Sequence, residues 1–395
     1  MKLLELDNPR EAIAIGCRLL KLFGLGRDER FKLVYWLQCV AYLAFSIVPR
    51  FLVEIEDMVA LMRLIAELVF VVYLCLQIMA LYCRRRQLYR LVDMLQQCID
   101  IPYSEQIESF LIRSNVKINQ SSAAYARFFM CVYVLYCTMS PLASGFVYIR
   151  NQRNATGVQE EFIITSEMKH VFPFPQWMVI LYDLDIRYNP LHYSIYAGLI
   201  FVLSAISSLS LCTKDVIDIA AIKTVTLVFG IVTMQIRDLH EQITQERLNR
   251  VIKSHRNALS CATQLEQALN LSVLFQFASC SANWCLMLFY ILLMGLDSRV
   301  LSVVLLLVIV SIETYTYCML GSQLTAQGED LLMALQQLSW YDQPVPIQRQ
   351  ILLMIQRSQT PLILRAGKLF SANVVQFGDI VQKSYSFFLV LKNVF

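Results

Sequence analysis

Two long stretches of the sequence, 191–212 and 271–296, contain no aspartate, glutamate, lysine or arginine. Each is long enough to cross the roughly 30 Å hydrocarbon layer of a bilayer, which takes a helix of about 20 residues. The rest of the chain agrees, because 57% of its 395 residues are hydrophobic and only 16% are charged. In soluble domains, roughly 45–50% of the residues are apolar and about 25% are charged. A membrane protein is therefore expected, and an ordinary soluble fold is disfavoured.

A scan for further stretches of this length gives seven predicted spans in all. They are 33–53, 64–82, 128–149, 191–212, 271–296, 300–320 and 369–391. In two of the spans a glutamate is the only charged residue, Glu67 in 64–82 and Glu313 in 300–320. Both carboxylates are expected to face the protein interior, because hydrocarbon does not solvate a charge. We therefore predict an all-α membrane protein with seven transmembrane helices.

One more apolar stretch, 224–236, is too short to count as a span. It is about half the length that a spanning helix needs and has charged residues on both sides. We interpret it as a helix buried in protein. If it crossed the bilayer instead, the count would become eight and the C-terminus would change sides.

The distribution of lysine and arginine predicts the orientation of the chain. Segments 1–32, 83–127 and 213–267 each contain seven of these residues. From the end of span one to the start of span two, and between spans five and six, the only such residues are Arg50, Arg63 and Arg299. Because cytoplasmic loops are enriched in lysine and arginine, the N-terminus is predicted to be cytoplasmic and the C-terminus extracellular.

The predicted outer connection 150–190 contains the sequon Asn154-Ala155-Thr156, so Asn154 is a predicted glycosylation site. This connection is long and aromatic, and we expect it to fold over the outer mouth of the bundle. In the cytoplasmic segment 1–32, Asn8 and Pro9 predict the start of an amphipathic helix. That helix either lies on the membrane surface or packs against the bundle.

No pattern in the sequence predicts catalysis. The four histidines form no metal-binding spacing, and no nucleophile elbow, phosphate-binding loop or dinucleotide fingerprint is present. We therefore expect no enzyme activity, no cofactor and no metal site. The net charge of +4 is small and dispersed, which disfavours nucleic-acid binding.

The last predicted span has a polar face. Its polar positions recur at intervals of three or four, which places them along one side of a helix: Asn373, Gln376, Asp379, Lys383 and Ser386, followed by Val390. Several copies meeting around an axis could enclose a pore with this face inward. The alternative is an ion pair between Asp379 and Lys383 that packs against neighbouring helices.

The outer halves of spans two, three, four and six contain aromatic and small polar residues that could line an apolar cavity for a small hydrophobic ligand. The candidate ligand-binding residues are Val71, Val72, Tyr136, Ser140, Tyr193, Tyr196, Ile200, Ser311 and Tyr315. Packing between helices is the alternative role for each of them.

The C-terminal part of the chain resembles the insect odorant receptors. The residues that carry the resemblance are Gln359, Pro361, Leu364, Ala366, Gly367, Phe370 and Phe377, the run Ser384-Tyr385-Ser386, and Phe388 and Leu391, with Cys318, Gly321 and Trp340-Tyr341 upstream. The resemblance is specific over about residues 235–391. The related gustatory receptors usually carry a Thr-Tyr motif where this chain has Ser384-Tyr385-Ser386.

The resemblance implies a ligand-gated, non-selective cation channel. Members of the family look like heterotetramers with a shared olfactory co-receptor, located in the plasma membrane of olfactory neuron dendrites and gated by volatile hydrophobic molecules. The family's last span lines the pore. By resemblance the pore-lining residues here are Gln376, Asp379, Lys383, Ser386, Phe387, Val390 and Leu391. The gate is assigned to the three apolar residues among them, Phe387, Val390 and Leu391. The co-receptor's longer cytoplasmic insertion is missing, so the chain resembles a ligand-tuning subunit.

The expected organisation follows from the spans and the resemblance. It comprises the N-terminal helix region 1–32, spans one to four in 33–212, anchor segment 213–267, spans five and six in 268–320, anchor segment 321–360, and the pore-lining span in 361–395. Three alternatives remain open. A receptor that signals through a G protein would keep its C-terminus in the cytoplasm, a gustatory-type channel would share the topology, and a transporter would move substrate without the co-receptor.

Overall fold

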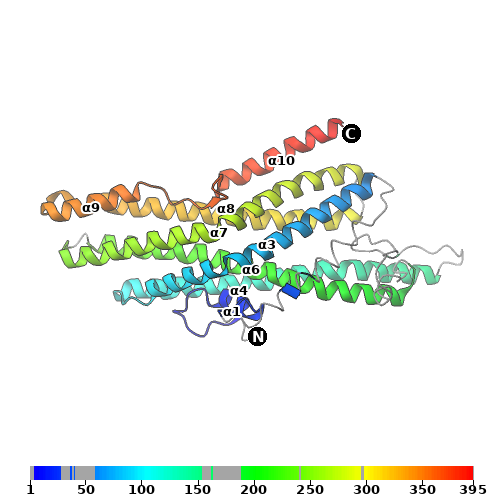
Figure 1. Cartoon of the computed structure of the whole chain (residues 1–395), viewed down its shortest axis with the longest axis horizontal. Coiled ribbons are helices and arrows are strands. Elements are labelled where there is room, and N and C mark those ends of the chain that lie inside the picture. The colour runs from blue at the N-terminus through cyan, green and yellow to red at the C-terminus, as the bar shows by residue number, and fades with distance from the viewer. Residues whose placement is uncertain are drawn as a thin grey trace.

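The structure is a computed structural model that describes residues 4–27, 36–37, 40, 58–153, 162, 188–239, 242–294 and 298–394. The described part is a bundle of long helices with one short hairpin (Figure 1). Its elements are α1 (Ala14–Leu22), α3 (Met58–Ile99), α4 (Glu105–Arg153), α6 (Pro190–Leu239), α7 (Gln245–Met294), α8 (Ser298–Gln336), the 3-10 turn η4 (Trp340–Asp342), α9 (Val345–Ser358), β1 (Arg365–Ala366), β2 (Phe370–Ser371) and α10 (Val374–Val394). The expected all-α fold is confirmed.

The helices are far longer than a bilayer requires. Helices α3, α4, α6 and α7 have 42, 49, 50 and 50 residues, or roughly 60–75 Å at 1.5 Å per residue. The predicted spans in 64–82, 128–149 and 191–212 are therefore segments of longer helices that continue without a break. The predicted first span, 33–53, lies almost entirely outside the described residues.

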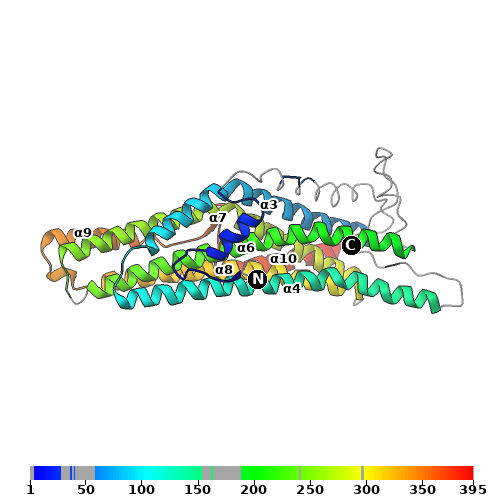
Figure 2. The ribbon, with the colours of Figure 1, turned by 90° about the horizontal axis from the view of Figure 1, so that it is seen from below.

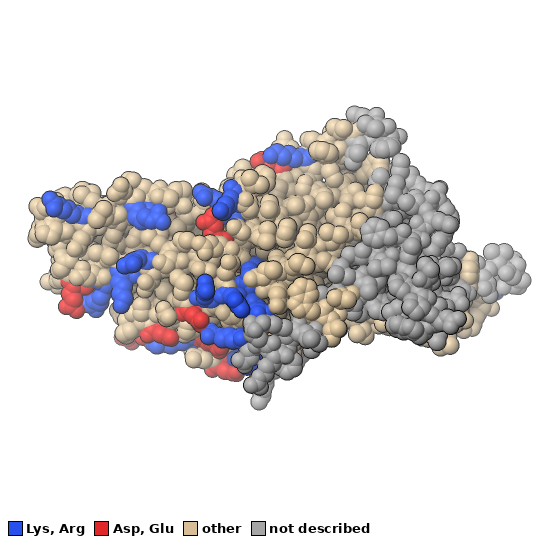
Figure 3. Space-filling model, in the orientation of Figure 1, with Lys and Arg blue, Asp and Glu red and all other residues tan. Residues whose placement is uncertain are grey.

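Charged side chains gather at one end of the bundle. On the face in Figure 3, lysine, arginine, aspartate and glutamate cover mainly the half that holds α9, and the described surface of the opposite half shows few of them. Large apolar side chains are exposed at that opposite end, among them Leu142 and Phe146 of α4 and Leu191 of α6. Exposed apolar area of this kind suits contact with lipid.

The C-terminal half of α6 is the centre of the core. Val225, Phe229 and Ile236 are each at most 1% exposed, so the prediction that 224–236 is buried in protein is confirmed. Among the residues that the structure describes, two helical segments are long and apolar enough to cross a membrane, 205–239 and 245–290. The apolar window of the first is 83% buried within the chain, which shows that its apolarity serves helix packing.

Helix α1 begins later than predicted. The backbone turns at Asn8, whose carbonyl oxygen accepts from Glu11 N–H at 3.1 Å, and the helix starts only at Ala14. The reason is tertiary, because the Asn115 amide donates to the carbonyl oxygens of Pro9 and Glu11 at 2.8 and 3.0 Å. These groups are therefore held by α4 rather than by a helical turn.

The apolar face of α1 packs against the bundle. Ile15 and Leu19 are 1% and 6% exposed and lie in one cluster with Ala123 and Ala126 of α4 and Val216 of α6. Figure 2 shows α1 lying across α6 near the middle of the bundle. Of the two alternatives left open for this helix, the structure supports packing against the bundle.

A hairpin precedes the last helix. The predicted span 369–391 began too early, because Phe370–Ser371 pairs with Arg365–Ala366 as an antiparallel hairpin and α10 starts at Val374. Gly367, at the turn, has a φ of 59° and donates its N–H to the carbonyl oxygen of Asn270 at 2.9 Å. Such a φ suits glycine, which has no Cβ. The hairpin ties the start of α10 to α7.

Gly321 allows α8 to approach the segment between this hairpin and α10. A Cβ at position 321 would overlap the backbone carbonyl oxygen of Ala372. We expect Gly321→Ala to lower the free energy of unfolding by about 1–3 kcal/mol, the usual cost of overpacking. Gly198→Ala is the control, because nothing lies within 4 Å of its added Cβ. Thermal unfolding of both purified variants checks this, and equal melting temperatures would contradict it.

Candidate functional site

Two of the predicted ligand-binding residues of α6, Tyr193 and Tyr196, lie in an aromatic cluster at the end of the bundle that shows few charges. Tyr193 and Tyr196 are 8% and 7% exposed, with ring centroids 6.4 Å apart. The Phe162 ring contacts Tyr193 at a tilt of 52°, with centroids 5.3 Å apart, and the ring of Tyr148 of α4 lies 6.5 Å from that of Phe162. This arrangement combines apolar ring faces with tyrosine hydroxyls, which suits a small, mainly apolar ligand.

The residues predicted on α3 lie elsewhere. Val71 is buried in a small cluster with Leu74 of the same helix and Leu211 of α6. Val72, the next residue, is 41% exposed. The backbones of Tyr136, Ser140 and Ile200 lie in α4 and α6, and their side chains are outside the described part of the chain.

Of the two residues predicted on α8, Tyr315 contacts α10 and Ser311 bonds within its own helix. Ser311 donates its hydroxyl to the Leu307 carbonyl oxygen at 2.7 Å. The Tyr315 ring meets Phe377 of α10 edge to face, with centroids 5.4 Å apart. The structure therefore places the predicted ligand residues whose side chains are described in three regions, and among them only Tyr193 and Tyr196 lie in direct ring contact with each other.

Helix α10 packs through one face only. Ile380 and Ser384 are 7% and 1% exposed, and the Ser384 hydroxyl lies 3.3 Å from that of Ser281 on α7. The Cys285 thiol donates to the Ser384 carbonyl oxygen at 3.4 Å. These contacts fix which side of α10 faces its own chain.

The predicted pore-lining residues lie on the other side of α10. Phe387 and Val390 are 67% and 61% exposed, Lys383 and Ser386 are exposed, and Gln376 and Asp379 are half-buried. The Leu391 side chain is outside the described residues. Among the described side chains, no ion pair joins Asp379 to Lys383, so the alternative of a packed ion pair gains no support.

Sequence reasoning missed a group of buried charges. Arg84 and Lys214 were counted as loop charges, but they are 5% and 1% exposed. Lys214 binds Glu313 of α8 at 3.0 Å, so the prediction that Glu313 faces inward is confirmed, whereas the Glu67 side chain is not described. Lys214, Asp215 and Asp218 follow directly on the stretch 191–212, which has no charged residue. That continuity was the signal that they lie on the same helix, within the core.

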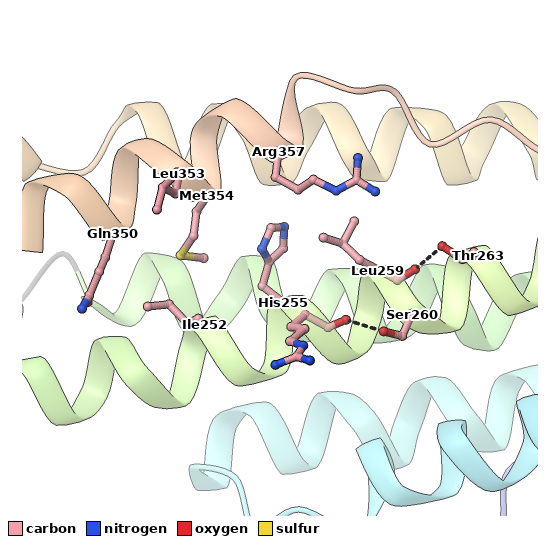
Figure 4. A pocket seen from close by; sticks show the side chains of 10 residues that line it. Ile252, His255, Leu259, Ser260, Thr263, Gln350, Leu353, Met354 and Arg357 are labelled. Atoms are coloured by element: carbon pink, nitrogen blue, oxygen red, sulfur yellow. Dashed lines mark hydrogen bonds between the residues drawn. The ribbon is translucent and has the colours of Figure 1, made fainter.

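An open groove of about 470 Å³ lies between α7 and α9 at the charged end of the bundle (Figure 4). Its lining residues are Ile252, His255, Arg256, Leu259, Ser260, Thr263, Gln350, Leu353, Met354 and Arg357. His255 lies between the two helices, with its Nε2 atom 3.2 Å from the Ser358 hydroxyl. Burial, together with the nearby Arg357 guanidinium, lowers the pKa of His255 from 6.5 to about 4.

A charged end and an end with few charges, joined by continuous helices, define a polytopic membrane protein. Residues 57–385 match the family model described as 7tm Odorant receptor. Odorant receptor 19a of Drosophila melanogaster is 28% identical over 144 residues, 36% of this chain and 37% of that protein. Odorant receptor 43b of the same species is 22% identical over 268 residues, 66% of this chain and 61% of that protein. The matched regions thus span less than two thirds of these relatives.

The fold agrees with the family. The olfactory receptor OR5 of Machilis hrabei, solved in complex with eugenol, is similar with a TM-score of 0.74 over 97% of this chain and 98% of that one, at 14% identity. The structure of the same receptor described without eugenol gives the same TM-score. This chain belongs to the seven-transmembrane odorant receptor family.

The depressed pKa of His255 predicts a loss of stability in acid. Native His255 stays neutral while unfolded chains take up a proton, so stability falls as the pH drops from 6.5 to about 4. We expect His255→Gln to remove on the order of 2 kcal/mol of this loss. Melting temperatures across this range check it, with His192→Gln as the control. An unchanged acid-side slope in His255→Gln would contradict the assignment.

Proposed function

We propose that this chain is the odorant-binding subunit of a ligand-gated, non-selective cation channel. The observation that carries the proposal is the uncovered side of α10, where Lys383 and Ser386 are exposed while Ile380 and Ser384 pack on the chain's own helices. A helix with an ionisable stripe in a membrane needs a water-filled path or other protein beside that stripe. Copies of α10 around one axis would provide both.

The partners follow from this geometry. One helix cannot enclose a pore, so the functional unit contains several subunits, and we propose a heterotetramer with an olfactory co-receptor. Segments 213–267 and 321–360 would form its cytoplasmic anchor. In this arrangement the groove beside His255, lined by Arg256 and Arg357, belongs to the anchor.

The proposed ligand is a volatile hydrophobic molecule. Its candidate contacts are Tyr193 and Tyr196 in the aromatic cluster and, on α8, Ser311 and Tyr315. The edge-to-face contact between Tyr315 and Phe377 gives a direct route from a ligand beside α8 to the last helix. Binding shifts the channel toward opening only if the open form has the higher affinity.

The proposed setting is the plasma membrane of olfactory neuron dendrites. The N-terminus and the α9 end of the bundle would lie in the cytoplasm, and the C-terminus outside. The charge distribution over the two halves of the molecule supports this orientation (Figure 3). Asn154 would then be open to glycosylation on the outer side.

Outside-out patches test the proposal. Cells that co-express the chain with an olfactory co-receptor are expected to show cation current evoked by a volatile from a broad panel, in patches without added nucleotides. Cells that express the co-receptor alone are the control. Responses that require GTP would favour the G-protein alternative, and silence across the panel despite surface expression would contradict the channel.

A further inference from the structure

Five charged side chains form a closed group where α3, α6 and α8 meet, which we call the buried ion cluster. Its members are Arg84 of α3, Lys214, Asp215 and Asp218 of α6, and Glu313 of α8. Each is at most 5% exposed as a residue. The cluster is separate from the aromatic cluster and from the exposed stripe of α10.

Lys214 and Arg84 each hold part of the cluster. The Lys214 ammonium lies 2.6 Å from Asp215 Oδ1 and 3.0 Å from Glu313 Oε1. A single cation therefore bridges two carboxylates from two helices. The Arg84 guanidinium binds Asp218 Oδ2 at 2.9 Å and also donates to the carbonyl oxygen of Ala268 at 3.3 Å.

The charges of the cluster do not balance. Three carboxylates face two cations, and among the described residues no third lysine, arginine or histidine forms an ion pair with Asp215, Asp218 or Glu313. Within the described part of the chain, one buried negative charge is therefore left over. An uncompensated charge away from water is strongly unfavourable, so such a group is neutralised or paired.

The hydrogen-bond donors fall short as well. The Tyr317 hydroxyl lies 3.0 Å from Asp215 Oδ1 and 3.2 Å from Asp218 Oδ2, but a hydroxyl has one hydrogen to donate. The Tyr73 hydroxyl likewise lies between Gln276 Oε1 and Glu313 Oε1, the latter at 3.2 Å. At each tyrosine, a proton on the carboxyl group would turn the second contact into a hydrogen bond.

The other described residues around the cluster supply no further positive charge. Tyr125 donates to Asp215 Oδ2 at 3.0 Å, and the Ser272 hydroxyl, with one hydrogen to donate, lies 3.0 Å from Gln77 Oε1 and 3.4 Å from Asp218 Oδ2. Asp218 Oδ1 is buried with no hydrogen-bond partner among the described residues. The titratable and charged groups that face Asp215 and Glu313 are Tyr73 and Arg84 from α3, Tyr125 from α4, Cys212, Lys214 and Asp218 from α6, Cys280 from α7, and Tyr317 from α8.

We propose that the buried ion cluster binds one proton, shared between the carboxyl groups of Asp215 and Glu313. A proton on Asp215 would donate to Tyr317, which then donates to Asp218. A proton on Glu313 would donate to Tyr73, which then donates to Gln276. Either position neutralises the excess charge and supplies the missing donor, whereas loss of the proton to water leaves two carboxylates that repel each other across the contact between α6 and α8.

Infrared difference spectroscopy of the purified full-length protein tests the proposal. On raising the pH from about 6.5 to about 8.5, the wild type is expected to lose the C=O stretching band of a protonated carboxylic acid. Asp215→Asn and Glu313→Gln each leave two carboxylates facing two cations, so each is expected to lack the band. Glu246→Gln is the control, because its carboxylate is 85% exposed and it should keep the wild-type signal.

Melting temperatures provide a second readout. A native carboxyl that keeps its proton binds it more tightly than the unfolded chain does, so stability falls as the pH rises over this range. We expect this fall in the wild type and in Glu246→Gln, and a flatter profile in Glu313→Gln. The proposal is overturned if the band persists in both cluster variants, or if the wild type has none. It is also overturned if replacing sodium and potassium by a large organic cation at fixed pH shifts the melting temperature, which would indicate a bound metal ion.

Discussion

Burial of the C-terminal half of α6 is the constraint on which the rest of the structure depends. This helix contacts α1, α3, α4, α7 and α8, and Val225, Phe229 and Ile236 along it are almost fully enclosed. The same helix carries Tyr193 and Tyr196 near its other end. One continuous element thus connects the candidate ligand region to the charged end of the bundle, and because packed cores resist continuous deformation, a shift at one end must be accommodated along its length.

A second set of contacts holds α10 and the segment before it against α7 and α8. Ser384 holds the middle of α10 against Ser281, the hairpin turn at Gly367 binds Asn270, and Gly321 admits the backbone at Ala372. The start of α10 is therefore set by backbone contacts, while its polar side is left open. A helix fixed on one side and uncovered on the other is suited to meeting equivalent helices from other subunits.

Much of the fold was predictable from hydropathy and charge. The spans between 64 and 320 overlap observed helices, and most of the last span falls on α10. The buried stretch 224–236 was recognised because it is too short to cross a bilayer and is flanked by charges. The start of α1 was not predictable, because the Asn115 amide holds the Pro9 and Glu11 carbonyls from a distant part of the chain. The hairpin before α10 was also missed, since its residues continue an apolar pattern. Lys214 was misassigned to a loop for a related reason: its partner Glu313 is distant in sequence.

The site was less predictable than the fold. Tyr193 and Tyr196 share a helix face, so their proximity followed from their spacing, but the position of Phe162 against them depends on a connection between helices. Tyr315 was predicted as a ligand contact, and its packing against Phe377 gives it a place at the junction with α10. Residue type indicated the chemistry in each case, and tertiary packing decided which residues meet.

Cysteine modification along α10 tests the central claim, that its polar side faces an ion pathway. In channels opened by ligand, a charged thiol reagent is expected to change the current through Lys383→Cys and Ser386→Cys. It should leave Ile380→Cys unchanged, because that position packs on the chain's own helices. Modification of Ile380→Cys alone, or no effect on current at any of the three positions despite labelling, would contradict the account.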